Sequence, residues 1–340
     1  MQQAKITHCV SYFPDKKLSN EDICEISNNW TPQKILAKTG IEYRNISADT
    51  ETSVDLAIGA ANRLFRDNPD LKDRVQYIIF CTQTPDYFLP TSACILQDAL
   101  ELKTAVGAID INQGCSGFVY GLSLAKGLIA SGIVENVLLI TADTYTKLIN
   151  PNDISVRTLF GDGACASFIE ARSPNQSGLA IGNFVFGTDG SGHKDLIVQA
   201  GGFRLPISKN TAVETQDIHG NVRSQQQLYM DGSKILIFGL SVVPKMIKSL
   251  LAQEELEINN IDHFIFHQAS LLMLKKLAQK LKLHEAKMPI ALQHNGNTVS
   301  STIPIALQQC LADNKILNGQ KLLLAGFGVG LSWAACILES

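Results

Sequence analysis

The sequence lacks the features that mark several large classes of protein. None of its eight cysteines sits in a Cys-x-x-Cys pair, which argues against a zinc ribbon or a disulfide framework. No uncharged apolar run is long enough to cross a bilayer. The first residues lack the basic region, apolar core and cleavage site of a signal peptide. We therefore expect a cytoplasmic protein without a membrane segment, whose cysteines mostly fill the core.

Charge of either sign is also scarce. There are 29 lysines and arginines against 32 aspartates and glutamates, and charged residues make up 18% of the chain. Because no concentrated basic run stands out, the sequence carries no electrostatic footprint for nucleic acid. With 340 residues, 45% of them hydrophobic, the chain can bury a sizeable core in two domain-sized units or in one layered domain.

Apolar runs that read as strands alternate with helical patterns, which is typical of an α/β fold. Strands are predicted at 75–83, 104–112, 134–143, 263–268 and 320–328, and helices at 53–65, 92–102 and 271–283. In the segment 116–131 the only charged residue is Lys126. This pattern predicts a helix that is buried on all sides, and 300–312 reads as its weaker counterpart.

A repeat is hidden in this alternation. Phe-Gly-x-Gly occurs at 160–163 and again at 327–330, each time before an apolar strand that ends near a glutamate. We interpret the repeat as an internal duplication, with halves at 1–173 and 174–340. Two buried helices between two sheets would then give a five-layered α-β-α-β-α body. Neither GK[ST] nor GxGxxG accompanies the glycines, so we expect them to serve tight turns and close packing, not a phosphate site.

Three residues could carry chemistry. Cys115 follows a predicted strand and opens the buried helix, where the helix dipole favours a thiolate; alternatively it is a small buried hydrophobe. His267 ends a predicted strand, and Asn297 lies in a loop beside Gly296. Each of these two is more often structural, but together with Cys115 they form a nucleophile pattern spread over both halves. His263 and His267 have no evident third ligand, so no metal site is predicted.

The chain resembles the β-ketoacyl-acyl carrier protein synthase III family of thiolase-fold condensing enzymes. The resemblance rests on KTGIEYR (38–44), GCSGFVYGLSLA (114–125), LFGDGACA (159–166), FHQAS (266–270), HNGNTVSSTIP (294–304) and GFGVGLSWA (326–334). These stretches run in family order over almost the whole chain. The resemblance implies a thiolase-like fold, a homodimer, and no metal, flavin or nicotinamide cofactor.

The resemblance also implies a two-step reaction. Cys115 would take an acyl group from an acyl-CoA or an acyl carrier protein thioester. A malonyl thioester would then lose CO2, and its carbanion would attack the acyl group to give a 3-oxoacyl product. His267 and Asn297 would donate hydrogen bonds to the malonyl thioester carbonyl, where enolate charge develops. The Cys115 N–H and one from the turn Gly328-Val329-Gly330 would form a second oxyanion hole, and Phe327 would wall the malonyl site.

The chain departs from the family pattern around the donor entrance. The family's CoA-binding tryptophan aligns with Lys34, although Trp30 is nearby, and Leu89 stands where the partner subunit supplies a gating phenylalanine. Lys275 and Lys276 could dock the carrier protein in place of an arginine that is absent here. The expected donor-binding residues are Lys34, Lys38, Leu89, Arg157, Met230 and Ser270. These departures predict a primer other than acetyl-CoA.

Three alternatives remain open at this point. The same chemistry could serve a specialised metabolite or a glycan-linked acyl chain. A non-extending acyltransferase would need Cys115 and His267 but not Asn297. A non-catalytic partner subunit would be expected to have lost its cysteine. A 3-hydroxy-3-methylglutaryl-CoA synthase would need a glutamate on the loop before Cys115, where the matching stretch offers only Asp86.

Overall fold

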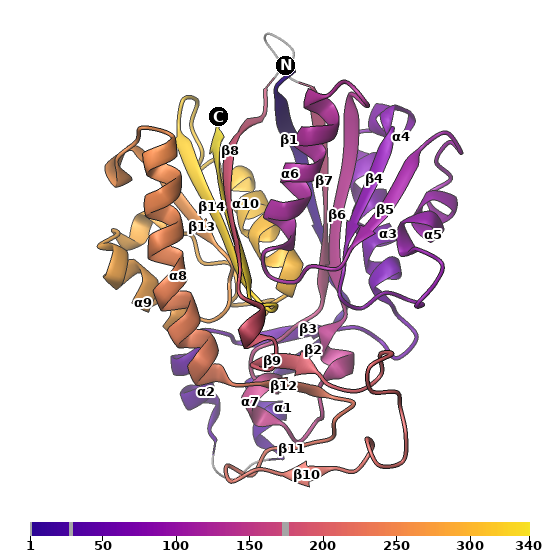
Figure 1. Ribbon diagram of the computed structural model, residues 1–340, viewed down its shortest axis with the longest axis vertical. Coiled ribbons are helices and arrows are strands. Elements are labelled where there is room, and N and C mark those ends of the chain that lie inside the picture. The colour runs from indigo at the N-terminus through magenta and orange to yellow at the C-terminus, as the bar shows by residue number, and fades with distance from the viewer. Residues whose placement is uncertain (1, 27–29, 172–176) are drawn as a thin grey trace.

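The computed structural model describes residues 2–26, 30–171 and 177–340. Its centre is a nine-stranded sheet in the order β13-β14-β15-β8-β1-β7-β6-β4-β5 (Figure 1). The strands are β1 (Ala4–Tyr12), β4 (Tyr77–Cys81), β5 (Gly107–Ile111), β6 (Asn136–Asp143), β7 (Gly163–Ala171), β8 (Leu179–Thr188), β13 (His263–Phe266), β14 (Lys321–Gly328) and β15 (Ser332–Glu339). All five predicted strands are among them.

The strand order repeats in the two halves of the chain. From β1 outward the N-terminal half runs β1-β7-β6-β4-β5, and from β8 outward the C-terminal half runs β8-β15-β14-β13. Parallel and antiparallel pairings match at each step, and only β5 has no counterpart among the described residues. The halves join where β1 pairs with β8, with Lys5 opposite Ala180. The predicted boundary between residues 173 and 174 lies outside the described residues.

Two helices lie between the halves of the sheet. Their apolar side chains share one core with strands of both halves, from Ile79 in β4 to Leu324 in β14. The sandwiched helices are α6 (Gly117–Ala130) and α10 (Thr302–Ala312). Pro304 falls in the first turn of α10, where its missing N–H breaks no hydrogen bond of the helix.

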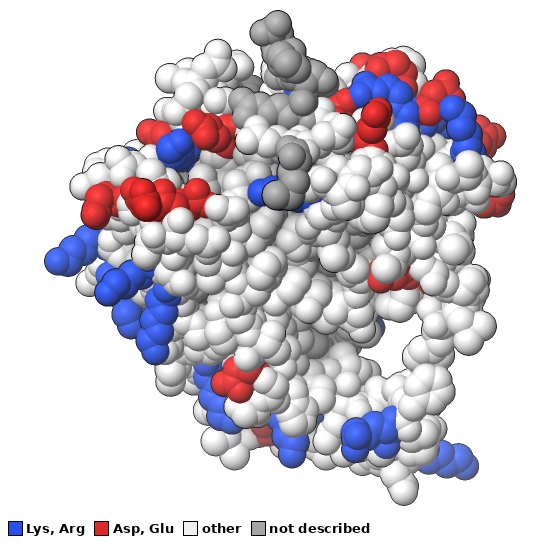
Figure 2. All heavy atoms as spheres, turned by 45° about the horizontal axis from the view of Figure 1, so that its top comes forward, with Lys and Arg blue, Asp and Glu red and all other residues white. Residues whose placement is uncertain are grey.

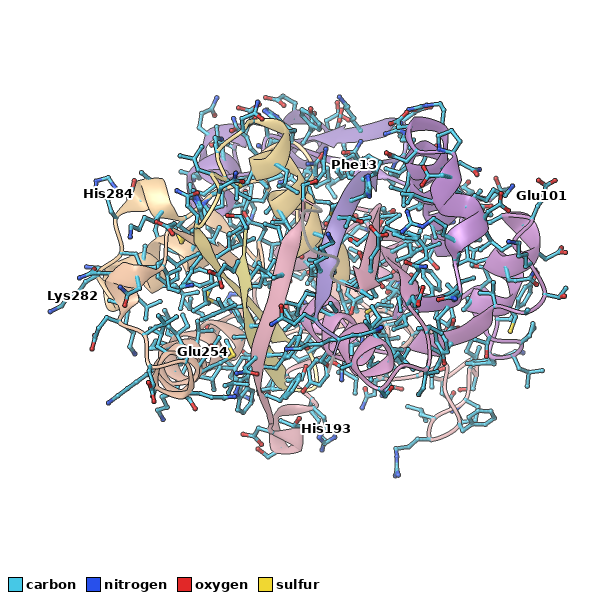
Figure 3. All side chains as sticks on the ribbon, turned by 90° about the horizontal axis from the view of Figure 1, so that it is seen from above. Phe13, Glu101, His193, Glu254, Lys282 and His284 are labelled. Atoms are coloured by element: carbon cyan, nitrogen blue, oxygen red, sulfur yellow. The ribbon has the colours of Figure 1, made fainter. Side chains whose placement is uncertain are left out.

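Outer helices complete the layers. Helices α3 (Ser53–Asp67) and α5 (Ser92–Ala99) cover the N-terminal half, while α8 (Gly232–Gln253) and α9 (Leu271–Leu281) cover the C-terminal half. In the view from above, Glu101 lies at the edge of the N-terminal half, and Glu254 and Lys282 lie at the opposite edge, in the C-terminal half (Figure 3). The predicted five-layered arrangement is therefore confirmed.

The remaining elements are short and lie mostly below the sheet in Figure 1. They are β2 (Lys16–Ser19), α1 (Asn20–Cys24), α2 (Pro32–Thr39), β3 (Tyr43–Ile46), α4 (Asp70–Arg74), η1 (Tyr145–Leu148), α7 (Ile154–Arg157), η2 (Gly190–Gly192), β9 (Leu196–Val198), β10 (Thr215–Gln216), β11 (Val222–Arg223), β12 (Leu228–Met230), η3 (Ile258–Asn260), η4 (Glu285–Lys287) and η5 (Val299–Ser301).

Two helices differ from the sequence prediction. Burial of α6 on all sides is wrong, because Leu124 is 44% exposed: the helix lies at the front of the molecule, and one of its sides reaches the surface (Figure 1). Helix α8 was not predicted. Among the described residues it is the one helix long and apolar enough to cross a membrane. Its side chains Val243, Ile247 and Leu250 pack into the core beside the sheet, as expected for an outer-layer helix.

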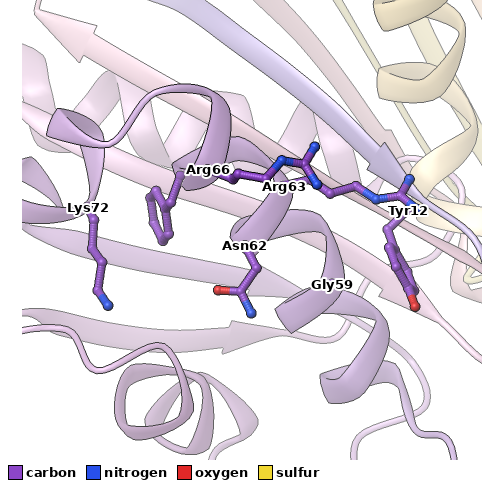
Figure 4. A pocket seen from close by; sticks show the side chains of 7 residues that line it. Tyr12, Gly59, Asn62, Arg63, Arg66 and Lys72 are labelled. Atoms are coloured by element: carbon purple, nitrogen blue, oxygen red, sulfur yellow. The ribbon is translucent and has the colours of Figure 1, made fainter.

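The surface shows few features that suggest a binding site. On the face shown in Figure 2, acidic and basic side chains gather in small groups near the margins, and the middle is uncharged. A hollow beside α3 is lined by Arg63, Arg66 and Lys72 among others (Figure 4). Each of these cations already has a partner, respectively the ring of Tyr12, Asp67 and Glu101. This hollow contains none of the predicted site residues.

Candidate active site

Cys115 lies in the turn between β5 and α6 and is 4% exposed. Strand β14 of the other half passes directly beside it. A Cβ atom added to Gly328 would lie 2.6 Å from the Cys115 sulfur, so only glycine fits at this position. The backbone N–H groups of Val329 and of Cys115 itself act on the thiol and lower its pKa. The thiol therefore sits at the seam between the two halves, with backbone N–H groups of both halves near it.

Burial dominates the acidity of this thiol. It raises the pKa of Cys115 to about 12, and the two N–H donors offset it only in part. The sequence led us to expect a pKa lowered by the start of the helix, and the structure contradicts that. Helix α6 begins two residues later, at Gly117, and removing a thiolate from water costs more than the nearby donors return. At neutral pH the group is a thiol.

His267 follows the end of β13 and is 2% exposed. Its Nδ1 lies 2.7 Å from the hydroxyl of Thr302. Its ring stands edge-on to that of Phe327, with 5.7 Å between the ring centroids. Burial lowers the pKa of His267 to about 3. The imidazole is therefore neutral over the physiological range, which suits a hydrogen-bond donor better than a cation.

Asn297 is held by its backbone between two loops. Its N–H donates to Leu159 O at 2.8 Å, and its carbonyl accepts from the Gly161 N–H at 3.1 Å. The loops approach so closely that a Cβ on Gly161 would lie 2.2 Å from Asn295 O. The side-chain Oδ1 accepts the Val299 N–H at 2.9 Å. Within the described parts of the chain, the amide NH2 has no partner, so it is available as a donor.

The loop after Asn297 is braced by the N-terminal half. Val299 has a φ of 54°, a left-handed conformation that costs energy for a β-branched residue. The buried carboxylate of Asp143, at the end of β6, accepts from the Ser300 hydroxyl at 2.5 Å and from its N–H at 3.3 Å. Ser301 donates its hydroxyl to Thr141 O at 3.0 Å. These bonds fix the loop that carries Asn297 relative to β6 of the N-terminal half.

Asp143 is a residue that sequence reasoning missed. It is fully buried, and it also accepts the Gln83 N–H at 2.8 Å. Burial raises its pKa to about 7, and the hydrogen bonds from Ser300 and Gln83 act in the opposite direction. The one available signal was an acidic residue at the end of an apolar strand run, VLLITAD. Charged residues are almost never fully buried without partners.

An apolar cluster lies against the thiol. We call it the Cys115 cluster; its buried members are Cys115, Tyr145, Val156, Phe160, Leu196, Leu228 and Val299. Met230, one of the expected donor-binding residues, packs against it. The Tyr145 hydroxyl donates to Gln83 Oε1 at 2.6 Å, so its polar end is satisfied while its ring faces Phe160. The surroundings of the thiol on this side are therefore mainly apolar.

The other expected donor residues lie away from this cluster. Lys34 is exposed on α2, and the Lys38 ammonium lies 5.1 Å from the ring centroid of Trp30. Arg157 ends α7 and donates to Pro151 O at 2.5 Å. The Ser270 hydroxyl caps α9 by accepting the Met273 N–H at 3.3 Å, which is a structural use of that side chain.

Three expected binding residues face outward. Leu89 is 81% exposed, next to the exposed Tyr87 and Phe88. Lys275 and Lys276 are exposed on the outer side of α9. The Nε2 of His263 contacts Lys315 O at 3.1 Å. Within the described ranges, no three His, Cys, Asp or Glu side chains gather to hold a metal ion.

Comparison with known proteins matches this arrangement to one family. A family model described as 3-Oxoacyl-[acyl-carrier-protein (ACP)] synthase III matches residues 109–190, and the model of its C-terminal part matches residues 251–340. The Beta-ketoacyl-[acyl-carrier-protein] synthase III of Chlamydia caviae is 35% identical over 342 residues, which cover 100% of this chain and 97% of that protein. This chain belongs to the β-ketoacyl-acyl carrier protein synthase III family.

Solved structures of this family have the same fold. A 3-oxoacyl-(acyl-carrier-protein) synthase III solved at 2.1 Å is 48% identical, with a TM-score of 0.96 over 99% of this chain and 100% of that one. The 3-oxoacyl-(acyl-carrier protein) synthase of Burkholderia xenovorans LB400 is 34% identical, with a TM-score of 0.89 over 99% and 94%. Thiolase-fold condensing enzymes are thus the structural class, and this chain is an acyltransferase of that class.

Proposed function

We propose that this chain condenses an acyl group held on Cys115 with a malonyl thioester, releasing CO2 and giving a 3-oxoacyl thioester. One observation carries the proposal. The buried Cys115 thiol lies against Gly328, the His267 ring contacts the preceding residue Phe327, and Asn297 accepts from Val299 of the Cys115 cluster. Family membership supports the same reaction.

In the first step the Cys115 sulfur attacks the carbonyl of an acyl-CoA or acyl carrier protein thioester. The bond from the carbonyl carbon to Cys115 forms, the bond to the departing thiol breaks, and the cysteine proton leaves with that thiol. The backbone N–H groups of Val329 and Cys115 act on the sulfur in the free enzyme and lower its pKa. They stand where they can bind the carbonyl oxygen as negative charge develops on it. The Cys115 cluster receives the alkyl chain.

In the second step a malonyl thioester loses its carboxylate as CO2, and the electron pair moves onto the thioester oxygen as an enolate. His267 and Asn297 donate to that oxygen. The enolate carbon then attacks the acyl carbonyl, and the bond to Cys115 breaks as the sulfur takes up one proton from solvent. Because the pKa of His267 lies near 3, its hydrogen bond needs no net charge. Phe327, edge-on to His267, walls this part of the site.

The residues expected at the entrance for the acyl thioester are proposed to set the substrate class. Lys34 and Lys38 with Trp30 on one side, and Arg157 on the other, suit the phosphates and the base of CoA or the phosphopantetheine of a carrier protein. Lys275 and Lys276 are proposed to dock an acidic carrier protein. The altered entrance favours a primer other than acetyl-CoA, and specialised metabolism is a second setting for it. A priming ketosynthase from the R1128 polyketide biosynthetic pathway has the same fold at 25% identity.

A homodimer in the cytoplasm completes the proposal. Strand β5 is the edge of the sheet, and Ile109 on it is 40% exposed. Phe88 is 80% exposed and Phe203 is 93% exposed, with 5.9 Å between their ring centroids. An open edge strand beside exposed aromatic rings is what a second copy can cover. Leu89, in the same loop, would then point into the partner's site.

The proposal is tested by mass spectrometry of the intact enzyme after mixing with a panel of acyl-CoA and acyl carrier protein thioesters. We expect a mass gain that equals one acyl group in the wild type and in Cys94→Ala, whose cysteine is exposed, and no gain in Cys115→Ala. Adding malonyl carrier protein should then release the acyl group as a 3-oxoacyl product. Transfer of the acyl group to an alcohol or amine without extension would instead identify an acyltransferase.

A further inference from the structure

Arg44 carries a positive charge that the protein encloses completely. It lies on β3 and is one of the largest fully buried side chains among the described residues. Burial lowers its pKa to about 10, so the guanidinium is still charged at neutral pH, and no carboxylate in the described part of the chain forms an ion pair with it. An enclosed charge is costly unless its N–H groups are hydrogen-bonded. The partners of Arg44 therefore show what this side chain holds in place.

All three nitrogens of the guanidinium donate to neutral oxygens. Nε and one terminal nitrogen donate to the carbonyl oxygen of Thr158, at 3.1 and 2.5 Å. The other terminal nitrogen donates to Asn20 Oδ1 at 2.6 Å, and the Asn20 NH2 in turn donates to Ile41 O at 2.8 Å. The Thr158 carbonyl has two lone pairs for its two donors. The guanidinium is thus fixed on the residue that directly follows α7.

The carbonyl that Arg44 binds begins the segment on which Asn297 is mounted. Segment 158–162 lies between β3 and the loop of Asn297. On the side of β3, the Asp162 N–H donates to Asn45 O at 2.9 Å. On the other side, the N–H and the carbonyl of Asn297 form hydrogen bonds with this segment at 2.8 and 3.1 Å. Segment 158–162 is therefore held to β3 at both ends and to Asn297 in between.

The stem of the same side chain lies against both partners of this pairing. A Cβ atom added to Gly161 would lie 3.3 Å from Arg44 Cβ, and one added to Gly296 would lie 3.0 Å from Arg44 Cγ. Gly296 directly precedes Asn297 in the chain. Arg44 therefore binds segment 158–162 through its guanidinium and packs against the loop of Asn297 through its stem.

We propose that Arg44 is a positioning residue for decarboxylation: it fixes segment 158–162 and, through it, the backbone of Asn297. This inference rests on the proposed function, in which the Asn297 NH2 donates to the enolate oxygen. Such a donor is effective only when it is held close to the position that the oxygen will occupy. Cys115 takes no part in these contacts, so acyl transfer to its sulfur should not depend on Arg44.

The variants Arg44→Met and Arg44→Lys remove the fork of donors. Methionine keeps an unbranched stem without any donor, and lysine keeps the charge but cannot bind one carbonyl through two nitrogens. Release of CO2 from malonyl carrier protein should be slowed by about 10–10²-fold in Arg44→Met and less in Arg44→Lys, while acylation of Cys115 stays within a few-fold. Arg63→Met is the matched control and should behave as the wild type, because Arg63 also donates to a backbone carbonyl, that of Ser11, but is exposed on α3.

A double variant separates a role through Asn297 from a general loss of stability. In an Asn297→Ala background, Arg44→Met should slow decarboxylation no further, because the amide that it positions is gone. A further loss of the same size in the double variant would overturn the inference, as would a wild-type rate in Arg44→Met alone. If Arg44→Met does not fold, Arg44→Lys with and without Asn297→Ala decides the point.

Hydrogen exchange of the resting enzyme, read by mass spectrometry, tests the contacts apart from the reaction. The peptide that contains Asn297 should exchange faster in Arg44→Met than in the wild type and in Arg63→Met, and the peptide that contains Cys115 should not change. Unchanged exchange at Asn297 would overturn the inference, whatever the enzyme condenses. Faster exchange there in a protein whose wild type condenses nothing would support Arg44 as the anchor of this loop and reject the proposed function.

Discussion

Gly328, in the C-terminal half, lies so close to Cys115, in the N-terminal half, that a Cβ atom added to it would be 2.6 Å from the Cys115 sulfur. The backbone N–H of the next residue, Val329, acts on the same thiol and lowers its pKa. The geometry of the nucleophile therefore depends on a strand that is far from it in sequence.

Gly328→Ala should impair acylation of Cys115 by about 10²-fold, because β14 or the thiol must shift by a large part of an ångström. The measurement is the single-turnover rate of acyl transfer, followed by mass spectrometry. Gly127→Ala on α6 is the matched control, since a Cβ there meets nothing within 4 Å. The control should keep its rate and gain up to about 1 kcal/mol of stability. Equal rates in both variants would show that the close approach is unimportant.

The pH dependence of thiol reactivity follows from burial. Because the pKa of Cys115 is raised to about 12, the thiolate fraction should increase about tenfold for each pH unit between pH 7 and 10. Alkylation by iodoacetamide, read at the Cys115 peptide, should rise with the same slope. A plateau below pH 8 would mean that the resting enzyme carries a thiolate, contrary to this structure.

Two substitutions of Asn297 separate the role of its side-chain NH2 from that of Oδ1, which accepts the Val299 N–H. Asn297→Ala removes the NH2 and also the acceptor of the Val299 N–H; Asn297→Asp keeps that acceptor but presents a carboxylate to the enolate. Both should lower decarboxylation by about 10²–10³-fold, while acylation of Cys115 stays within a few-fold. Asn295→Ala in the same loop should behave as the wild type, because its side chain makes only a 3.5 Å contact with Ala291 O. Normal condensation by Asn297→Asp would refute the enolate role.

The raised pKa of Asp143 predicts how the free energy of unfolding changes with pH. Its folded pKa of about 7 lies above the usual 3.8, so the folded protein binds this proton more tightly than the unfolded chain. The stabilisation that Asp143 gives to the folded state is therefore fully present below pH 4 and is lost as the pH rises to 7. Asp143→Asn should remove that downward trend in urea unfolding measured between pH 4.5 and 8 at fixed protein concentration. An unchanged trend in the variant would assign it to other groups.

The proposed dimer gives a fifth test. Ile109→Lys places a charge on the edge strand β5, and it should shift the mass measured by light scattering from dimer toward monomer. Ile133→Lys is the control: Ile133 is 66% exposed, but it follows α6 and is not on β5. If Ile109→Lys remains a dimer, the two copies do not meet at that edge.

Much of this fold was predictable from the sequence because its signals are local. Apolar runs such as VENVLLITAD give β6, and the repeated Phe-Gly-x-Gly anticipates the two strands, β7 and β15, that follow it. The resemblance named Cys115, His267 and Asn297 as one set, and the structure holds them on elements that meet at the seam. Their roles remain predictions for the experiments above.

What the sequence did not reveal depends on contacts between distant residues. The thiol pKa of Cys115 was misjudged because burial by β14 is invisible in the local pattern of a helix start. The hydrogen bond from Ser300 to Asp143 joins the two halves, and the sequence around a strand-end aspartate does not identify its donor. Helix α8 was missed because Pro244 interrupts an otherwise helical pattern.

The Cys115 cluster has a consequence for how the enzyme can change. Tyr145, Val156, Leu196 and Leu228 belong to η1, α7, β9 and β12, none of which is part of the nine-stranded sheet. Cys115 and His267, in contrast, directly follow strands of that sheet or precede its central helix. Substitutions in the four peripheral elements can therefore accumulate without moving these two groups. If the cluster receives the alkyl chain as proposed, a small number of such changes is the shortest route to an enzyme with a different acyl preference.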